Sequence, residues 1–240
     1  PAIWDRWRAV AHSLNAPILM GMPLHHTGAG ATEQHTNGAL VIQPRDASHG
    51  VPRISWHYDK RHLVPFGEFI PPGFHWFVNA MQIPLGDFDR GDTHQVALQV
   101  GSQRFAVNIC YEDTFGAEIA ATVRPDPAGK SPSILVNLSN LAWFGDGWAL
   151  RQHLWIARMR ALETGRPMIR ATNTGMTAAI DPLGRVRAVL EPVTPGVLDV
   201  EVQGTHGLTP YVRWGDAPIL IWLLACLLLG LWRRRAAPQV

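Results

Sequence analysis

Cys110 is the residue whose type and position most suggest chemistry. It ends the apolar run 105–109 and is followed by the polar residues Tyr111, Glu112 and Asp113. This pattern places the thiol where a strand gives way to a loop, which is where α/β folds bind ligands and where neighbouring charges can tune a nucleophile. On residue type alone, a buried structural cysteine is the more common case.

Lys60 is one of only two lysines in a chain that otherwise uses arginine as its cation. It follows the predicted strand 53–58 and precedes a turn that leads to Glu68. A cation at a strand end could point into the same crevice as Cys110, where an ammonium would stabilise a thiolate and the oxyanion of a tetrahedral acyl intermediate. Glu68 could orient that ammonium. The alternative is a solvated surface lysine, and the pattern does not separate the two.

Other kinds of reactive site are not predicted. The histidines lack the i, i+4 helical pairing or the cysteine partners of zinc sites, and no serine lies in a GxSxG turn. Residues 28–31 lack the third glycine and the strand-to-helix context of a dinucleotide loop. We therefore expect no metal and no cofactor.

The apolar periodicities predict a mixed α/β layered body that positions these residues. Helices are expected at 4–14, 117–123 and 148–164. Strands are expected at 16–20, 38–42, 53–58, 96–100, 105–109, 134–138, 168–171, 177–180, 186–190 and 197–202. Residues 66–92 fit neither period and are expected to form a long functional loop.

The composition limits the size of the core and the classes of partner that the chain can have. A chain of 240 residues can bury one core of ordinary size. Its 21 Lys and Arg against 19 Asp and Glu give a net charge of only +2, which argues against nucleic acid as a partner. Two cysteines, Cys110 and Cys226, exclude a disulfide framework.

The C-terminal region carries a membrane signal. Residues 217–232 include no charged side chain, and arginines follow at 233–235. As a helix this stretch is about 24 Å long, short of a typical hydrocarbon core. Trp222 and Trp232 nevertheless suit the interfacial belt, and the arginines suit a cytoplasmic end. We expect a transmembrane helix here, with a buried core helix as the alternative.

Five motifs occur in a fixed order along almost the whole chain. They are Tyr58-Asp59-Lys60, Leu63-Val64-Pro65-Phe66-Gly67-Glu68, Ile109-Cys110-Tyr111-Glu112, Ala157-Arg158-Met159-Arg160-Ala161-Leu162-Glu163 and Gly207-Leu208-Thr209-Pro210-Tyr211. In this order they resemble the apolipoprotein N-acyltransferase family, a membrane branch of the nitrilase superfamily. A lone Cys-Tyr-Glu would be a weak signal, whereas the ordered set with the terminal apolar run is specific.

The resemblance implies a nitrilase-like α-β-β-α sandwich, N-terminally truncated, at residues 1–206. A connector at 207–216, the transmembrane helix at 217–232 and a cytoplasmic tail at 233–240 would follow. We expect the chain to be a C-terminal fragment, since the family's seven earlier membrane helices and its triad glutamate would lie upstream of Pro1.

The resemblance also implies roles for individual residues. The family uses a Glu-Lys-Cys triad, in which Cys110 would take an acyl chain as a thioester and Lys60 would stabilise the thiolate and the oxyanion. Glu68 matches a second, supporting glutamate. Tyr111 and Glu112 match residues beside the nucleophile, and the backbone N–H of Tyr111 could complete an oxyanion hole.

One motif departs from the family pattern. Where the family commonly has Asn-Asp-Ala-Trp-Phe-Gly, this chain has a leucine, Leu141, in place of the aspartate, so no role for that carboxylate carries over. Trp143 and Phe144 still match residues of a mobile loop near the acyl site. A pair of core aromatics is the alternative.

The implied activity is a transfer of a fatty acyl chain from a phospholipid, through Cys110, to the α-amine of the N-terminal diacylglyceryl-cysteine of an apolipoprotein. The implied location is the bacterial inner membrane, with the body in the periplasm. A membrane-tethered amidase that uses water as acceptor and an inactive binding module are the alternatives. Because the triad glutamate would lie upstream, we expect this chain alone to be inactive.

Overall fold

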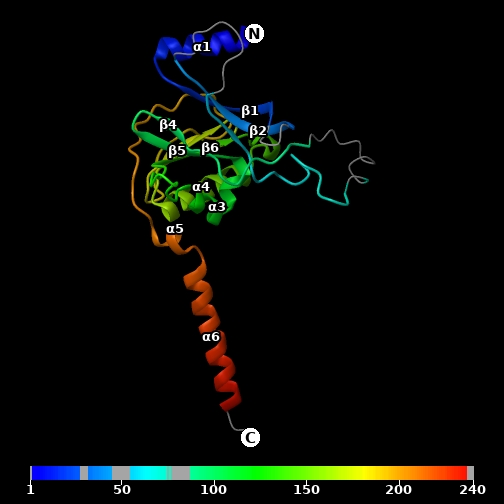
Figure 1. The fold of residues 1–240 in the computed structure, drawn as a ribbon, viewed down its shortest axis with the longest axis vertical. Coiled ribbons are helices and arrows are strands. Elements are labelled where there is room, and N and C mark those ends of the chain that lie inside the picture. Colours follow the sequence, from blue (N-terminus) through cyan, green and yellow to red (C-terminus); the bar gives the residue numbers. More distant parts are fainter. Residues whose placement is uncertain (1, 28–31, 45–54, 75, 77–86, 237–240) are drawn as a thin grey trace.

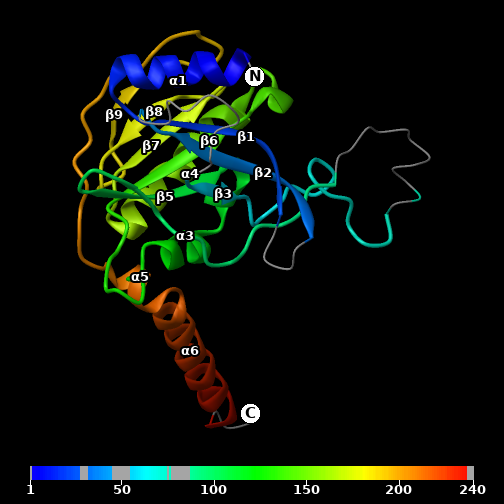
Figure 2. The same ribbon diagram turned by 45° about the horizontal axis from the view of Figure 1, so that its top comes forward.

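The computed structural model describes residues 2–27, 32–44, 55–74, 76 and 87–236. They form four layers, a helix, two β-sheets and a second group of helices, with a further helix that extends away from the body (Figure 1). From top to bottom in Figure 1, α1 (Ala2–Leu14) lies over one sheet, and α3 (Gly116–Thr122) and α4 (Trp148–Thr164) lie on the far side of the other. Figure 2 shows the same layers tilted, with α1 at the top.

The first sheet has three antiparallel strands in the order β1-β2-β3. They are β1 (Ile18–Thr27), β2 (Glu33–Ile42) and β3 (His57–Asp59). In this register Gly38 of β2 lies opposite Asp59 of β3. The strand order therefore places Lys60, the residue after β3, beside the middle of β2.

The second sheet has six strands in the order β4-β5-β6-β7-β8-β9. They are β4 (Leu98–Val100), β5 (Gln103–Ile109), β6 (Ile134–Ser139), β7 (Met168–Thr172), β8 (Ala178–Ile180) and β9 (Val186–Val189). Strands β5, β6 and β7 are parallel, and the other pairs are antiparallel. The carboxyl ends of the three parallel strands therefore meet at one edge, and Cys110 follows the first of them.

Alternation along the strands builds three apolar interfaces between the four layers. On β2, Ala39 packs between the two sheets, whereas Leu40 packs toward α1. On β6, Leu135 packs against α3 and α4, whereas Val136 faces the other sheet. Both sheets are thus buried on both faces, as the near-continuous apolar run of β6 requires.

Most of the predicted elements form close to their predicted places. Helix α4 has the predicted bounds and ends at Gly165, whose left-handed φ of +63° lets its N–H bond back to the carbonyls of Ala161 and Leu162. The hairpin β1–β2 is longer than predicted. In the loop predicted at 66–92, residues 75 and 77–86 lie outside the described part of the chain.

The predicted strand at 197–202 is wrong. The segment is extended and its exposure alternates, but it joins neither sheet. Val200 and Val202 instead line a shallow cavity with Ile180 and Arg187. The alternation of apolar residues in the sequence indicates that one side of an extended chain is buried. A chain can be buried in this way without a hydrogen-bonded neighbouring strand.

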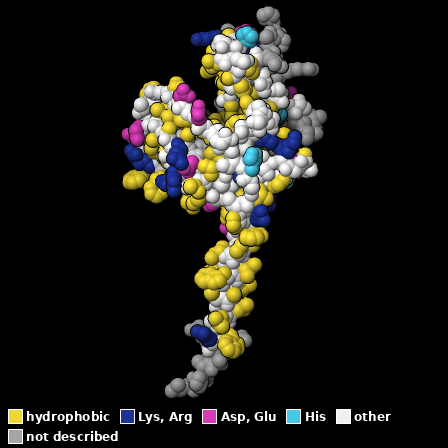
Figure 3. Space-filling model, turned by 90° about the vertical axis from the view of Figure 1, so that its left-hand side faces the viewer, with side chains coloured by type: hydrophobic (Ala, Val, Ile, Leu, Met, Phe, Trp, Pro, Cys, Tyr) yellow, Lys and Arg dark blue, Asp and Glu magenta, His cyan; other side chains and the backbone are white. Residues whose placement is uncertain are grey.

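The predicted transmembrane helix at 217–232 is also wrong. A helix does form there, α6 (Ala217–Ala236), and Figure 3 shows it as a stalk lined with apolar side chains. No helix in the described part of the chain, however, is both long enough and apolar enough to cross a bilayer. Its uncharged part measures only about 24 Å, against a hydrocarbon core of about 30 Å, and arginines occupy its last turn.

Three short helical elements complete the described part of the chain. The turn η2 (Ala142–Phe144) lies between β6 and α4, and α5 (Pro210–Trp214), which is capped by the Thr209 side chain, lies between β9 and α6. The turn η1 (Cys110–Thr114) follows β5 directly. Both 3-10 turns lie at the carboxyl edge of the parallel strands.

Gly38 provides a test of the contact between β2 and β3. A Cβ atom there would overlap the Leu24 side chain and lie 2.7 Å from the backbone oxygen of Tyr58. Overpacking of this kind costs about 1–3 kcal/mol. We expect Gly38→Ala to lower the free energy of unfolding by that amount in denaturant titrations. Gly230→Ala, in α6 with open space around it, is the control, and equal effects of the two changes would contradict the assignment.

Candidate active site

Cys110 lies at the carboxyl edge of the six-stranded sheet in a strained conformation. It is the first residue of η1, and its φ is +50°, in the left-handed region that non-glycine residues rarely adopt. The thiol is partly buried, with its Sγ 4.0 Å from the carbonyl oxygen of Asn140. A sharp turn directly after a strand presents a side chain to the crevice above the sheet, which is the geometry of a nucleophile.

Opposing effects set the pKa of the Cys110 thiol. Burial raises it most, and the carboxylates of Asp113 and Glu68 add to the rise. The ammonium of Lys60 and a hydrogen bond from the backbone N–H of Tyr111 lower it, but by less, so the pKa lies above its ordinary value. A thiol in this setting needs a base to remove its proton before it can attack.

Lys60 is held in place by backbone and side-chain contacts. Its N–H donates to the carbonyl oxygen of Asn37 at 2.8 Å, and its side chain is fully buried. The Nζ atom donates to both carboxylate oxygens of Glu68 at 2.8 Å. Glu68 also accepts from the Asn37 amide at 2.7 Å and from the backbone N–H of Val64 at 2.8 Å. Lys60 and Glu68, which the sequence suggests as partners, are therefore in direct contact.

Glu112 joins the Lys60 segment to the Cys110 turn. Its carboxylate is fully buried and accepts from the backbone N–H groups of Ile109 (2.7 Å), Arg61 (2.7 Å) and His62 (3.2 Å) and from the Tyr58 hydroxyl (2.9 Å). Burial raises the pKa of Glu112, and these hydrogen bonds oppose that rise. All four groups that hydrogen-bond to this carboxylate are donors, so its role is to fix the two segments relative to each other.

A buried charged group lies behind the nucleophile. The Asp113 carboxylate lies 3.4 Å from Nη1 of Arg170 on β7 and 3.1 Å from Nε2 of His153 on α4. Arg170 also contacts the His153 ring and donates to the backbone oxygens of His153 and Met176, each at 3.2 Å. Sequence reasoning missed this group, because its members are far apart in the chain and belong to three different elements.

Trp143 and Phe144 lie on η2 at the same edge of the sheet. Their exposed fractions, 75% and 56%, rule out a pair of core aromatics. Leu141, at the position where the family pattern commonly has aspartate, is 1% exposed. The amide of Asn173, which follows β7, donates to the Asn140 side chain at 2.6 Å and so ties the ends of β6 and β7 together.

The Tyr111 side chain belongs to an aromatic group beside the nucleophile. Its ring meets those of Phe115 and His62 edge-on, at centroid distances of 5.2 and 5.8 Å. The His62 ring stacks on Phe115 at 3.5 Å. This packing holds the turn that carries the Tyr111 N–H next to the thiol.

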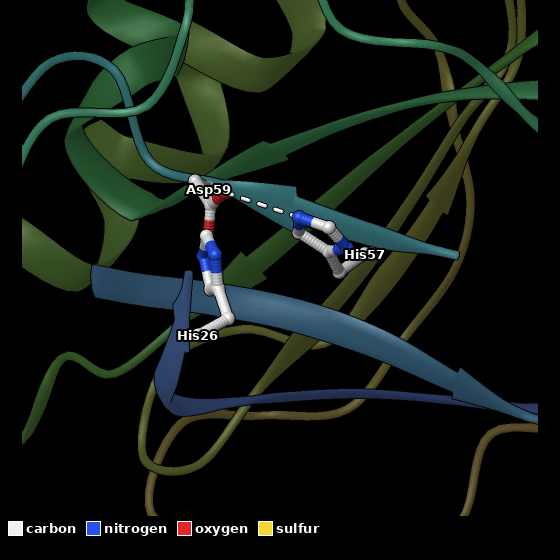
Figure 4. Close-up of side chains that lie close together, drawn as sticks. All are labelled: His26, His57 and Asp59. Carbon is white, nitrogen blue, oxygen red and sulfur yellow. Dashed lines mark hydrogen bonds and ion pairs between the residues drawn. The ribbon is translucent and has the colours of Figure 1, made fainter. Parts of the chain in front are cut away.

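A separate group of side chains has the chemistry of a metal site. His26, His57 and Asp59 each offer a ligand atom, and these atoms lie within 4.8 Å of one another (Figure 4). The sequence analysis predicted no metal ligands, because the cue it used was helical or cysteine spacing and these residues come together across a sheet.

Comparison with known proteins identifies relatives over most of the chain. The sequence model of the family described as carbon-nitrogen hydrolase matches residues 2–211. A protein of Bordetella bronchiseptica named apolipoprotein N-acyltransferase is 49% identical over 99% of this chain and 44% of its own length. One of Ralstonia nicotianae with the same name is 55% identical over 96% of this chain and 42% of its own length. The chain thus spans less than half the length of these relatives.

The fold resembles solved structures of an amidase. One, an amidase from Nesterenkonia sp., has a TM-score of 0.55 and 19% sequence identity over 81% of this chain and 64% of its own. A second structure, of a variant of this amidase described as belonging to the nitrilase superfamily, has a TM-score of 0.54 over 81% of this chain and 65% of its own, also at 19% identity. This likeness confirms the nitrilase-like α/β part of the predicted fold.

Lys60 can be tested through the reactivity of the thiol. In a Cys226→Ala background, Lys60→Gln removes the positive charge that favours the thiolate and keeps a donor for Glu68. The pKa of Cys110 should rise, so alkylation by iodoacetamide near neutral pH should slow by a factor of about 3 to 10 and its pH profile should move to higher pH. Lys130→Gln, at the other lysine, is the control. An unchanged profile would show that Lys60 does not act on the thiol.

Glu112 can be tested through stability. In Glu112→Gln the new amide would turn a donor toward N–H and O–H groups that are themselves donors. We expect the free energy of unfolding to fall by about 2–4 kcal/mol in denaturant titrations. Glu33→Gln is the control, because that side chain is 80% exposed. If the two changes had equal effects, Glu112 would not be the link described above.

Proposed function

Since this chain belongs to the carbon-nitrogen hydrolase family, we propose that it carries the Cys110 nucleophile of an enzyme that transfers acyl groups through a thioester. One observation carries the proposal. The thiol lies at a strained turn where the ammonium of Lys60 and the N–H of Tyr111 both favour its charged form. The same two groups would stabilise the oxyanion that forms when the thiolate attacks a carbonyl.

The chemistry follows in two halves. A base removes the thiol proton, the sulfur attacks the carbonyl carbon of an ester, and the tetrahedral intermediate collapses with loss of the alcohol to leave an acyl-Cys110 thioester. An amine then attacks the thioester carbonyl and the thiol is released. In the family that the motifs resemble, this base is a glutamate, and we propose that the parent protein supplies it from outside this chain. Glu68 is engaged with Lys60, so its role is to position that lysine.

The names of the relatives support acyl transfer to a nitrogen atom of an apolipoprotein, and the resemblance to the family implies the donor. We propose that the acyl donor is a phospholipid and that the acceptor is the α-amine of an apolipoprotein's N-terminal diacylglyceryl-cysteine. The reaction would take place at the bacterial inner membrane, on its periplasmic side. The exposed Trp143 and Phe144, at the same edge of the sheet as Cys110, are suited to contact an acyl chain. An amide is more stable than a thioester, so the second half-reaction is favourable.

The test is intact mass spectrometry of the full-length parent protein after incubation with phospholipid. We expect an adduct with the mass of an acyl group that neutral hydroxylamine removes. Cys110→Ala should lack the adduct, and Cys226→Ala, at the other cysteine, should retain it. Absence of any adduct would overturn the proposal. Release of free fatty acid or turnover of simple amides, without transfer to an amine, would indicate an amidase that uses water as acceptor.

A further inference from the structure

His26, His57 and Asp59 converge on the outer face of the three-stranded sheet. On β1 and β2, the residues with even numbers, such as Leu24 and Leu40, pack toward α1. His26 shares that face by alternation, and His57 and Asp59 lie opposite Leu40 and Gly38, which also belong to it. Tyr58, between them, packs in the core between the sheets. The cluster therefore lies on the opposite face of the sheet from Cys110.

The three side chains meet above β2, the middle strand of the sheet. β2 lies between β1 and β3, and Thr36 of β2 lies on the same face, where its hydroxyl contacts Asp59. The imidazole of His26 reaches across β2 to Asp59, and Figure 4 shows it and the His57 ring turned toward the Asp59 carboxylate. The closest atoms are 3.0 Å apart for His26 Nε2 and Asp59 Oδ1 and 3.4 Å for His57 Nε2 and Asp59 Oδ2.

These distances suit a tetrahedral transition-metal ion. Zinc–nitrogen and zinc–oxygen bonds of about 2.0–2.1 Å place neighbouring ligand atoms about 3.3 Å apart. The two histidine–carboxylate distances, one to Oδ1 and one to Oδ2 of Asp59, are close to that value. One ligand atom from each of the three residues lies within 4.8 Å of the other two. Small rotations of the two imidazole rings would complete the triangle. Two histidines, one carboxylate and a water are a common ligand set for zinc.

Residues outside the cluster hold the Asp59 carboxylate in place, as is usual for metal ligands. The Thr36 hydroxyl donates to Asp59 Oδ1 at 2.5 Å. The Gln95 amide brackets the Asp59 backbone, accepting from its N–H at 2.8 Å and donating to its carbonyl at 2.6 Å.

We propose that His26, His57 and Asp59 bind one divalent transition-metal ion of the zinc class. The His57 side chain is 42% exposed and that of His26 is 20% exposed, so solvent can reach the cluster and supply the fourth ligand. The ion would join β1 to β3 across β2, directly before the buried Lys60. Its binding does not depend on the activity proposed for Cys110.

The test is calorimetric titration of zinc chloride into the protein that carries both Cys110→Ala and Cys226→Ala, in which no thiol can compete as a ligand. We expect one ion per chain, with affinity at least about tenfold weaker in His26→Gln and in His57→Gln. His25→Gln is the matched control, because His25 is the adjacent residue on β1 and lies on the other face of the strand. The zinc affinity of His25→Gln should match that of the parent.

A second readout separates loss of binding from loss of folding. Zinc should raise the melting temperature of the protein with both cysteines replaced by alanine and of His25→Gln in that background, but not of His57→Gln, whose circular dichroism without metal should match that of the parent. Cobalt(II) should give the intense visible absorption of a tetrahedral site. No stoichiometric binding, or binding unaffected by both His26→Gln and His57→Gln, would overturn the proposal.

Discussion

The buried carboxylate of Glu112 is the interaction on which the arrangement of the candidate site depends. One strand of each sheet ends in a residue that bears chemistry, Lys60 after β3 and Cys110 after β5, and nothing in strand pairing relates the two sheets to each other. Glu112 accepts N–H groups from the segment after Lys60 and from the last residue of β5. Within the apolar interface that packs the two sheets together, this anion links the segment of the cation to the segment of the nucleophile.

The electrostatic balance around Cys110 is the second constraint. Two carboxylates and burial disfavour the thiolate, and one ammonium and one N–H favour it. The Lys60 charge is in turn compensated by Glu68, so its field at the sulfur is that of a hydrogen-bonded ion pair rather than of a lone cation. The raised pKa keeps the resting thiol in its protonated, less reactive form, and donors for a developing oxyanion would already be in place.

Much of this architecture could be predicted from the sequence, because strands buried on both faces and a helix with clear stop signals leave strong local patterns. The bounds of α4 and the strand before Cys110 are examples. The prediction of a strand at 197–202 was wrong, because alternation indicates that one side of the chain is buried and does not require pairing with another strand. The prediction of a membrane helix was wrong, because an apolar composition does not make a segment long enough to cross a bilayer. The groups around Asp113 and Asp59 could not be predicted, because they form between elements brought together only by the fold.

The backbone of Cys110 restricts which nucleophile this turn could carry. At a φ of +50°, a side chain with one substituent on Cβ can be accommodated, whereas a β-branched one adds a clash to a conformation that is already unfavourable. Serine could therefore replace the cysteine in evolution without a new steric clash, whereas threonine could not. The shape of the turn, independently of sulfur chemistry, narrows the routes by which this site could diverge.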